Sequence, residues 1–221
     1  MLTTKRRAVE ELRNLGVWVY FDYQYSDGRP SLGKNSTYVV DASPNVPKLL
    51  VDILGVDFFY SVVHLDLMRK PHEAGETEAV PYAAPEWADS LDWIPNVMKL
   101  SIKGDQVDIN VLEKISKLNH LEELSILGTN NVSFPTGSPV ILNRSINDEC
   151  IQILAEAPAL RKLAISRCEL GDDSLNSFST FKQLESLVVE GKFSEESIRN
   201  LKERLPETTV FVTNHSDTSH Q

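Results

Sequence analysis

The stretch Leu160-Arg161-Lys162-Leu163-Ala164-Ile165 carries apolar residues at its first, fourth and sixth positions. Apolar residues that alternate with other residues indicate a short β-strand with one buried face. The same apolar-x-x-apolar-x-apolar pattern occurs five times, starting at residues 62, 97, 121, 160 and 184. The starts are separated by 35, 24, 39 and 24 residues, so a 24-residue unit occurs twice, and insertions of 11 and 15 residues lengthen the other two intervals. Such a recurring unit predicts a repeat architecture.

Between the predicted strands lie apolar residues at helical spacing, which indicate one amphipathic helix per unit. These residues are Val111, Leu112, Ile115 and Leu118; Ile151 and Leu154; Leu175, Phe178 and Phe181; and Ile198, Leu201 and Leu205. The helices are expected to be capped at Asp108, at Asn147 or Asp148, at Asp172 or Asp173, and at Ser194. One strand-helix unit cannot bury its apolar face alone, so the units must stack with their strands parallel.

The segment before the repeats has a different pattern. Ala8, Val9, Leu12 and Leu15 form a helical stripe that stops at Gly16, and 17–25 is rich in residues that favour strands. A second short helix is expected from Pro47 to Leu54, closed by Gly55. We therefore predict an N-terminal cap over 1–58, a repeat domain over 59–212 and a polar, disordered tail over 213–221.

Two insertions, 69–92 and 129–145, have the prolines, glycines or acidic residues of exposed loops. They are interpreted either as part of a binding face or as neutral surface length. Within the first, Trp87 is expected to be exposed, and Trp93, just beyond it, is expected to fill the core.

The fourth repeat, 160–168, resembles the leucine-rich repeat consensus, including Cys168 where that family places Asn or Cys. The third repeat, 121–129, resembles repeats of bacterial leucine-rich repeat proteins related to the ribonuclease-inhibitor-like class, and 7–16 and 54–59 are similar to the cap of that group. The resemblance covers roughly 5–212, with departures at Asp105 and Lys192. It implies an α/β solenoid with a parallel concave β-sheet and convex helices. Members of the family mostly serve as recognition surfaces, and in this group a membrane anchor often precedes the cap.

Composition restricts the classes of partner. A net charge of −10 argues against nucleic acid, because phosphate binding requires clustered Lys and Arg. The two cysteines are too few for a disulfide scaffold and have no metal-ligand spacing with the histidines, so no cofactor is expected. No stretch is long and apolar enough for membrane insertion. The basic start is typical either of a true N-terminus or of the flank of an anchor, so the compartment is either the cytoplasm or the soluble side of a membrane-anchored protein. We expect a monomer.

Residues that alternate with the buried strand positions should face solvent on the concave side. They form three expected columns, which we take as the partner-binding residues. The first is His64, Lys99, Glu123, Lys162 and Ser186; the second is Asp66, Ser101, Ser125, Ala164 and Val188; the third is Met68, Lys103, Leu127, Ser166 and Glu190.

This mixture of charged, polar and apolar side chains favours a non-enzymatic module that binds a protein or peptide. The alternative is a structural or envelope-associated scaffold without a selective concave site. His64 and Asp66 share a face at strand spacing, but the repeat register places no third ligand or nucleophile beside them, so no catalytic residues are predicted. Trp18, Tyr20, Tyr23 and Tyr25 are interpreted either as packing within the cap or as an exposed aromatic platform.

Overall fold

The computed structural model describes residues 2–30, 38–39, 42–68, 85–128, 146–168 and 170–214. The chain has an α/β fold with a seven-stranded sheet in which strand order follows chain order. The antiparallel edge strand β1 pairs with β2, and every other neighbouring pair is parallel. The strands are β1 (Trp18–Phe21), β2 (Val62–Asp66), β3 (Lys99–Lys103), β4 (Glu123–Leu127), β5 (Lys162–Ser166), β6 (Ser186–Gly191) and β7 (Thr209–Asn214).

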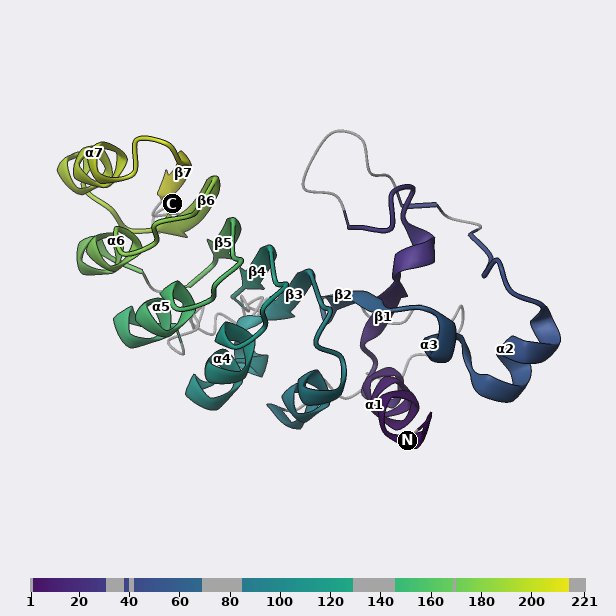
Figure 1. Ribbon diagram of the computed structural model, residues 1–221. Helices are drawn as coiled ribbons and strands as arrows, with labels where there is room; N and C mark the ends of the chain where they lie inside the picture. The colour runs from purple at the N-terminus through teal and green to yellow at the C-terminus, as the bar shows by residue number, and fades with distance from the viewer. Residues whose placement is uncertain are drawn as a thin grey trace, which may run out of the picture.

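Four helices follow four successive strands and line the same side of the sheet (Figure 1). They are α4 (Ile109–Ser116), α5 (Asp148–Ala155), α6 (Asp172–Phe178) and α7 (Glu195–Arg204). The caps expected at Asp108, Asn147 and Ser194 are confirmed, since each side chain accepts a hydrogen bond from the backbone N–H three residues later. At α6 the expectation was wrong. Gly171 is its N-cap, and Asp172 instead accepts a hydrogen bond of 2.8 Å from the Ser194 N–H at the start of α7.

The apolar positions of the repeated pattern form the core in register. Leu65, Leu100, Leu124, Leu163 and Leu187 lie side by side on β2 to β6, and all are fully or almost fully buried. Ile102, Ile126, Ile165 and Val189 form a second buried row two residues along. Regular rows of this kind require each unit to present the same face to the same side, which is the condition for one continuous core.

The N-terminal segment contains the expected helix, strand and helix. Helix α1 (Leu2–Asn14) is followed by Gly16 in the left-handed region (φ 79°), and α2 (Lys48–Leu54) ends at Gly55 (φ 84°). A short 3₁₀ helix, η1 (Asp22–Gln24), and helix α3 (Val56–Phe59) complete it. Lys5 Nζ donates to the carbonyl oxygens of Asp57 and Tyr60 at 2.7 and 2.9 Å, which holds α1 against the end of α3.

The expectations for 69–92 and its tryptophans were partly wrong. Residues 69–84 lie outside the described residues, but Pro85–Trp93 forms a 3₁₀ helix, η2, that packs between α1 and α4. Trp87 is fully buried there and Trp93 is 53% exposed, the reverse of the prediction. The apolar spacing of Trp87, Ala88 and Leu91 was a local signal for a buried helical face.

The insertion 129–145 and residues 215–221 of the tail lie outside the described residues. Strand β7 includes Thr213 and Asn214, which the sequence placed in the tail. Among the residues that the structure describes, no helix has both the length and the apolar character needed to cross a membrane.

Candidate binding face

The side of the sheet opposite α4 to α7 is here called the open face (Figure 1). On β4 and β5 the side chains that alternate with the core rows are only partly buried, which places them on this face. The first two predicted columns are in register as expected. His64, Lys99, Glu123, Lys162 and Ser186 are successive partners across β2 to β6, and so are Asp66, Ser101, Ser125, Ala164 and Val188. The pairing is therefore confirmed, whereas the role of these residues in binding a partner stays a prediction.

Two charges of the first column, those of Lys99 and Glu123, are matched within the sheet. Lys99 Nζ lies 2.5 Å from Glu123 Oε1, and both side chains are partly buried. Cross-strand pairs of opposite charge stabilise neighbouring strands modestly, by about 0.2–1 kcal/mol. A partner is consequently not needed to neutralise these two charges.

The middle column changes character along the sheet. Ser125 and Ala164, on the central strands β4 and β5, have short, half-buried side chains. Towards the C-terminal end the column becomes apolar and exposed: Val188 is 37% exposed, and Phe211, its partner on β7, is 58% exposed. Large apolar side chains with this much contact to water commonly mark an interaction site when they adjoin one another.

The third column is in register from Lys103 through Leu127 to Ser166, and all three side chains are partly exposed. Met68 lies just beyond the end of β2, where its N–H donates to Asp66 Oδ1 at 2.9 Å. Glu190 accepts a hydrogen bond of 3.2 Å from the N–H of Arg167, whose φ of 57° is left-handed. This contact joins β6 to the turn that follows β5.

At the N-terminal end, the expectation that His64 and Asp66 face solvent was wrong. Their exposed fractions are 9% and 8%, because β1 pairs with β2 and brings its own side chains over this end of the open face. The same expectation was wrong for Ser101, the partner of Asp66 on β3, which is 8% exposed. The Tyr20 ring stacks on the His64 ring at 4.7 Å with an angle of 13°. The Tyr25 hydroxyl shares a hydrogen bond of 2.7 Å with His64 Nδ1. Burial raises the pKa of Tyr25 well above its ordinary value, and the nearby Tyr20 raises it further. The Tyr25 hydroxyl therefore stays protonated.

The aromatic residues of β1 and its surroundings both pack and remain partly accessible. Tyr20 is buried against His64, whereas Trp18, two residues earlier on the same face, is exposed and stacks on Tyr20 with centroids 6.3 Å apart. The rings of Tyr20 and Tyr38 are nearly perpendicular, with centroids 5.4 Å apart. Tyr20 is packed, as one interpretation expected, but its stacking partner His64 lies on the first repeat strand and not within the predicted cap. Trp18 and Tyr38 form an accessible rim. Within the described ranges no group of three or more His, Cys, Asp and Glu side chains is placed to hold a metal ion.

Sequence reasoning missed the open-face side chains on the two outer strands. On β1 they are Trp18 and Tyr20, which pair with Asp66 and His64. On β7 they are Thr209, Phe211 and Thr213, which continue the three columns after Ser186, Val188 and Glu190. Alternation within 18–21 and 209–213 was the available signal, but neither segment carries the full repeat pattern.

Both cysteines of the chain lie buried. Cys168 lies fully buried in the turn after β5, and its Sγ is 3.5 Å from the carbonyl oxygen of Ser166. Burial raises the pKa of the Cys168 thiol to about 12 and also raises that of Cys150, which lies at the start of α5.

Both cysteines are therefore expected to be inert in the folded protein, because only the thiolate reacts with thiol reagents. A chromogenic disulfide reagent at about pH 8 should modify neither thiol in the native protein and both in denaturant. The variant Gln152→Cys, at an exposed position of α5, is the reactive control. Rapid labelling of Cys168 in the native chain would contradict its burial in the turn after β5.

No protein-family model matches the chain, and no curated protein is similar to it at a significant level. The geometry and side-chain chemistry of the open face are therefore the basis for the function proposed next.

Proposed function

We propose that the chain is a short leucine-rich repeat solenoid that binds an extended segment of a partner protein on its open face and catalyses no reaction. The repeated apolar pattern and its in-register burial support the architecture. The observation that carries the binding role is the middle column. Its short side chains at Ser125 and Ala164 lie between Glu123 and Lys162 on one side and Leu127 and Ser166 on the other. The column ends in exposed Val188 and Phe211.

The dimensions suit a short peptide. Four strands, β4 to β7, carry the accessible part of the middle column, because Asp66 on β2 and Ser101 on β3 are buried. At about 4.8 Å per strand, this part is about 14 Å long, which an extended segment of about four residues would span. The short side chains let a peptide backbone approach the sheet, and the longer side chains of Glu123, Lys162 and Leu127 limit its sideways movement.

The chemistry along the column specifies the order of contacts. An apolar side chain of the partner would contact Val188 and Phe211, where removal of apolar surface from water favours binding. At the opposite end of the accessible column, the paired charges of Lys99 and Glu123 present a fixed arrangement of donor and acceptor. Such charged groups contribute specificity more than affinity.

A bulky residue in the middle column should weaken binding. A displayed library of random heptapeptides is panned against the wild-type chain, and the enriched peptides are titrated by fluorescence anisotropy. Ser125→Trp is expected to weaken them by at least about 10-fold, which corresponds to about 1.4 kcal/mol. The matched control is Gln152→Trp, at an exposed position on α5, on the helix side of the sheet, and it should bind as the wild type does.

A second variant tests the charge pattern without leaving either charge unpaired. Lys99→Glu combined with Glu123→Lys keeps an ion pair and reverses its polarity. Peptides that contact the pair should discriminate between this variant and the wild type, with folding stability changed by less than about 1 kcal/mol. A scaffold without a selective face would enrich no peptide. Enriched peptides that bind Ser125→Trp and wild type equally would place their site elsewhere.

A further inference from the structure

Strand β7 forms the C-terminal edge of the sheet, and among the described residues no strand pairs with its outer side. The Thr209 N–H donates to the Glu185 carbonyl oxygen at 2.9 Å, so Thr209 directs its backbone groups towards β6. Because successive residues of a strand direct these groups to opposite sides, Val210 and Val212 present their N–H and C=O groups to the outer side. An edge of this kind is a template for pairing with another strand.

The sequence of this edge is a palindrome: Thr209-Val210-Phe211-Val212-Thr213 reads the same in both directions. A two-fold axis beside Phe211 would therefore place every residue opposite an identical or equivalent residue of an antiparallel copy. Isologous interfaces require such self-complementarity, because the same patch serves both subunits.

We propose that the outer edge of β7 pairs antiparallel with β7 of a second copy of this chain, with Phe211 at the two-fold axis. The directions of the backbone groups fit this register. Val210 of one copy and Val212 of the other would form the hydrogen-bonded pairs, and Phe211 would face its equivalent in a non-hydrogen-bonded pair, where side chains come closest. This dimer replaces the monomer expected from the sequence. Phe211 also lies at the apolar end of the middle column, so dimerisation is measured by mass and not by peptide binding.

Electrostatics favour contact at this edge over contact elsewhere. Two copies that each carry a net charge of −10 repel one another, so a shared interface is best placed where charge is absent or balanced. Strand β7 contains no charged residue. The flank of α7 beside it carries two carboxylates and two cations, at Glu195, Glu203, Arg199 and Lys202.

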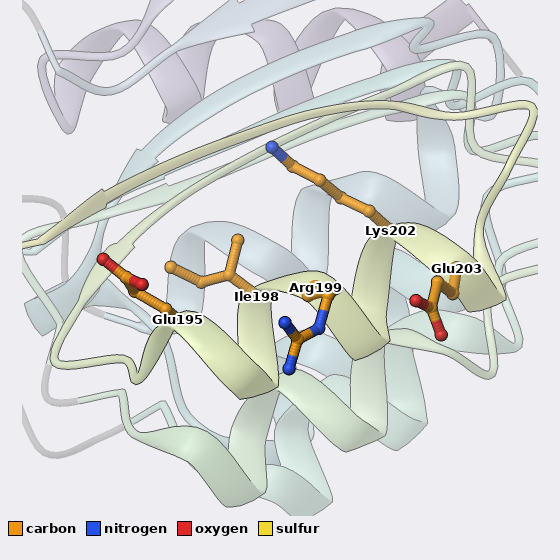
Figure 2. Close-up of a pocket in the computed structure, with 5 residues that line it drawn as sticks. All are labelled: Glu195, Ile198, Arg199, Lys202 and Glu203. Carbon is orange, nitrogen blue, oxygen red and sulfur yellow. The ribbon is translucent and has the colours of Figure 1, made fainter.

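The same flank has unfilled apolar surface. Ile198 lies with the four charged side chains of the α7 flank around a shallow pocket of about 400 Å³ (Figure 2). On the opposite side of α7, Arg204 donates to Asn176 of α6, so the pocket is on the side of α7 away from α6. Ile198, Val210 and Val212 pack against the core but are only partly buried. An axis perpendicular to the sheet would bring α7 of the second copy to this flank and cover these side chains.

The test uses the purified chain in sedimentation equilibrium from about 1 to about 500 µM. We expect the wild type to rise from the mass of one chain to that of two. Phe211→Lys and Phe211→Glu should each remain monomeric, because two like charges would meet at the axis, and an equimolar mixture of the two should recover the dimer. Phe58→Lys is the matched control, since Phe58 on α3 is 53% exposed against 58% for Phe211, and it should dimerise as the wild type does.

Crosslinking gives a second readout that does not depend on charged variants. Phe211→Cys should form a disulfide-linked dimer under mild oxidation, seen on a non-reducing gel, while Phe58→Cys should form far less. A wild type that stays monomeric throughout the concentration range overturns the proposal. So does a dimer that survives Phe211→Lys, a mixture that fails to recover it, or equal crosslinking at the two positions.

Discussion

Replacing Trp87 with alanine is expected to lower the free energy of unfolding by about 3–5 kcal/mol, the cost of emptying a large aromatic site in a core. The indole is completely buried on η2, which packs against α1 and α4. Its Nε1–H donates to the carbonyl oxygen of Gln106 at 3.4 Å. The variant loses packing on several sides at once and leaves that buried carbonyl without its indole donor.

Urea unfolding followed by circular dichroism measures the effect. Trp93→Ala is the matched control, because it removes an indole at the other end of the same helix, six residues away. That indole is half exposed, so its removal should lower the free energy of unfolding by less than about 1 kcal/mol. Trp87→Phe should fall between Trp87→Ala and the wild type, because it fills part of the space. Equal destabilisation by the two alanine variants would contradict the packing of η2.

Replacing Gly128 with alanine should destabilise the chain by about 3 kcal/mol, since inserted atoms in a packed region force the backbone apart. Gly128 follows β4, and its N–H donates to the Ser166 carbonyl oxygen at 2.7 Å. A Cβ at this position would lie 1.9 Å from the carbonyl oxygen of Arg167, which is backbone and cannot rotate away. The two neighbouring units would have to separate at their turns.

The same unfolding experiment checks this expectation. Gly171→Ala is the control, because a Cβ there meets no heavy atom within 4 Å and the residue has an extended φ of −128°. Because Gly171 is the N-cap of α6, where alanine is less favourable, the effect of this substitution should be up to about 1 kcal/mol, well below that of Gly128→Ala. If Gly128→Ala lowered the free energy of unfolding no more than Gly171→Ala does, the turns after β4 and β5 would not be in close contact.

Local periodicity was enough to predict the repeated strand-helix units. Each strand face and each helix face is encoded by residues a few positions apart, such as Leu163 and Ile165 or Val111 and Ile115, so the pattern can be recognised without tertiary contacts. Regular stacking then fixed the register, which is why Lys99, Glu123 and Lys162 lie beside one another as expected.

Pairing between distant segments decided the rest. His64 and Asp66 have the local pattern of solvent-facing residues, but β1, more than 40 residues earlier in the chain, covers them through the antiparallel pairs Tyr20–His64 and Trp18–Asp66. Trp87 is buried and Trp93 is exposed because η2 packs against α1 and α4 through the face that carries Trp87. The prolines around η2 indicated an exposed loop and gave no sign of this packing. The sequence alone thus determined the periodic faces of the chain. Tertiary structure decided which of those faces remain in contact with water, because burial depends on segments that are remote in sequence.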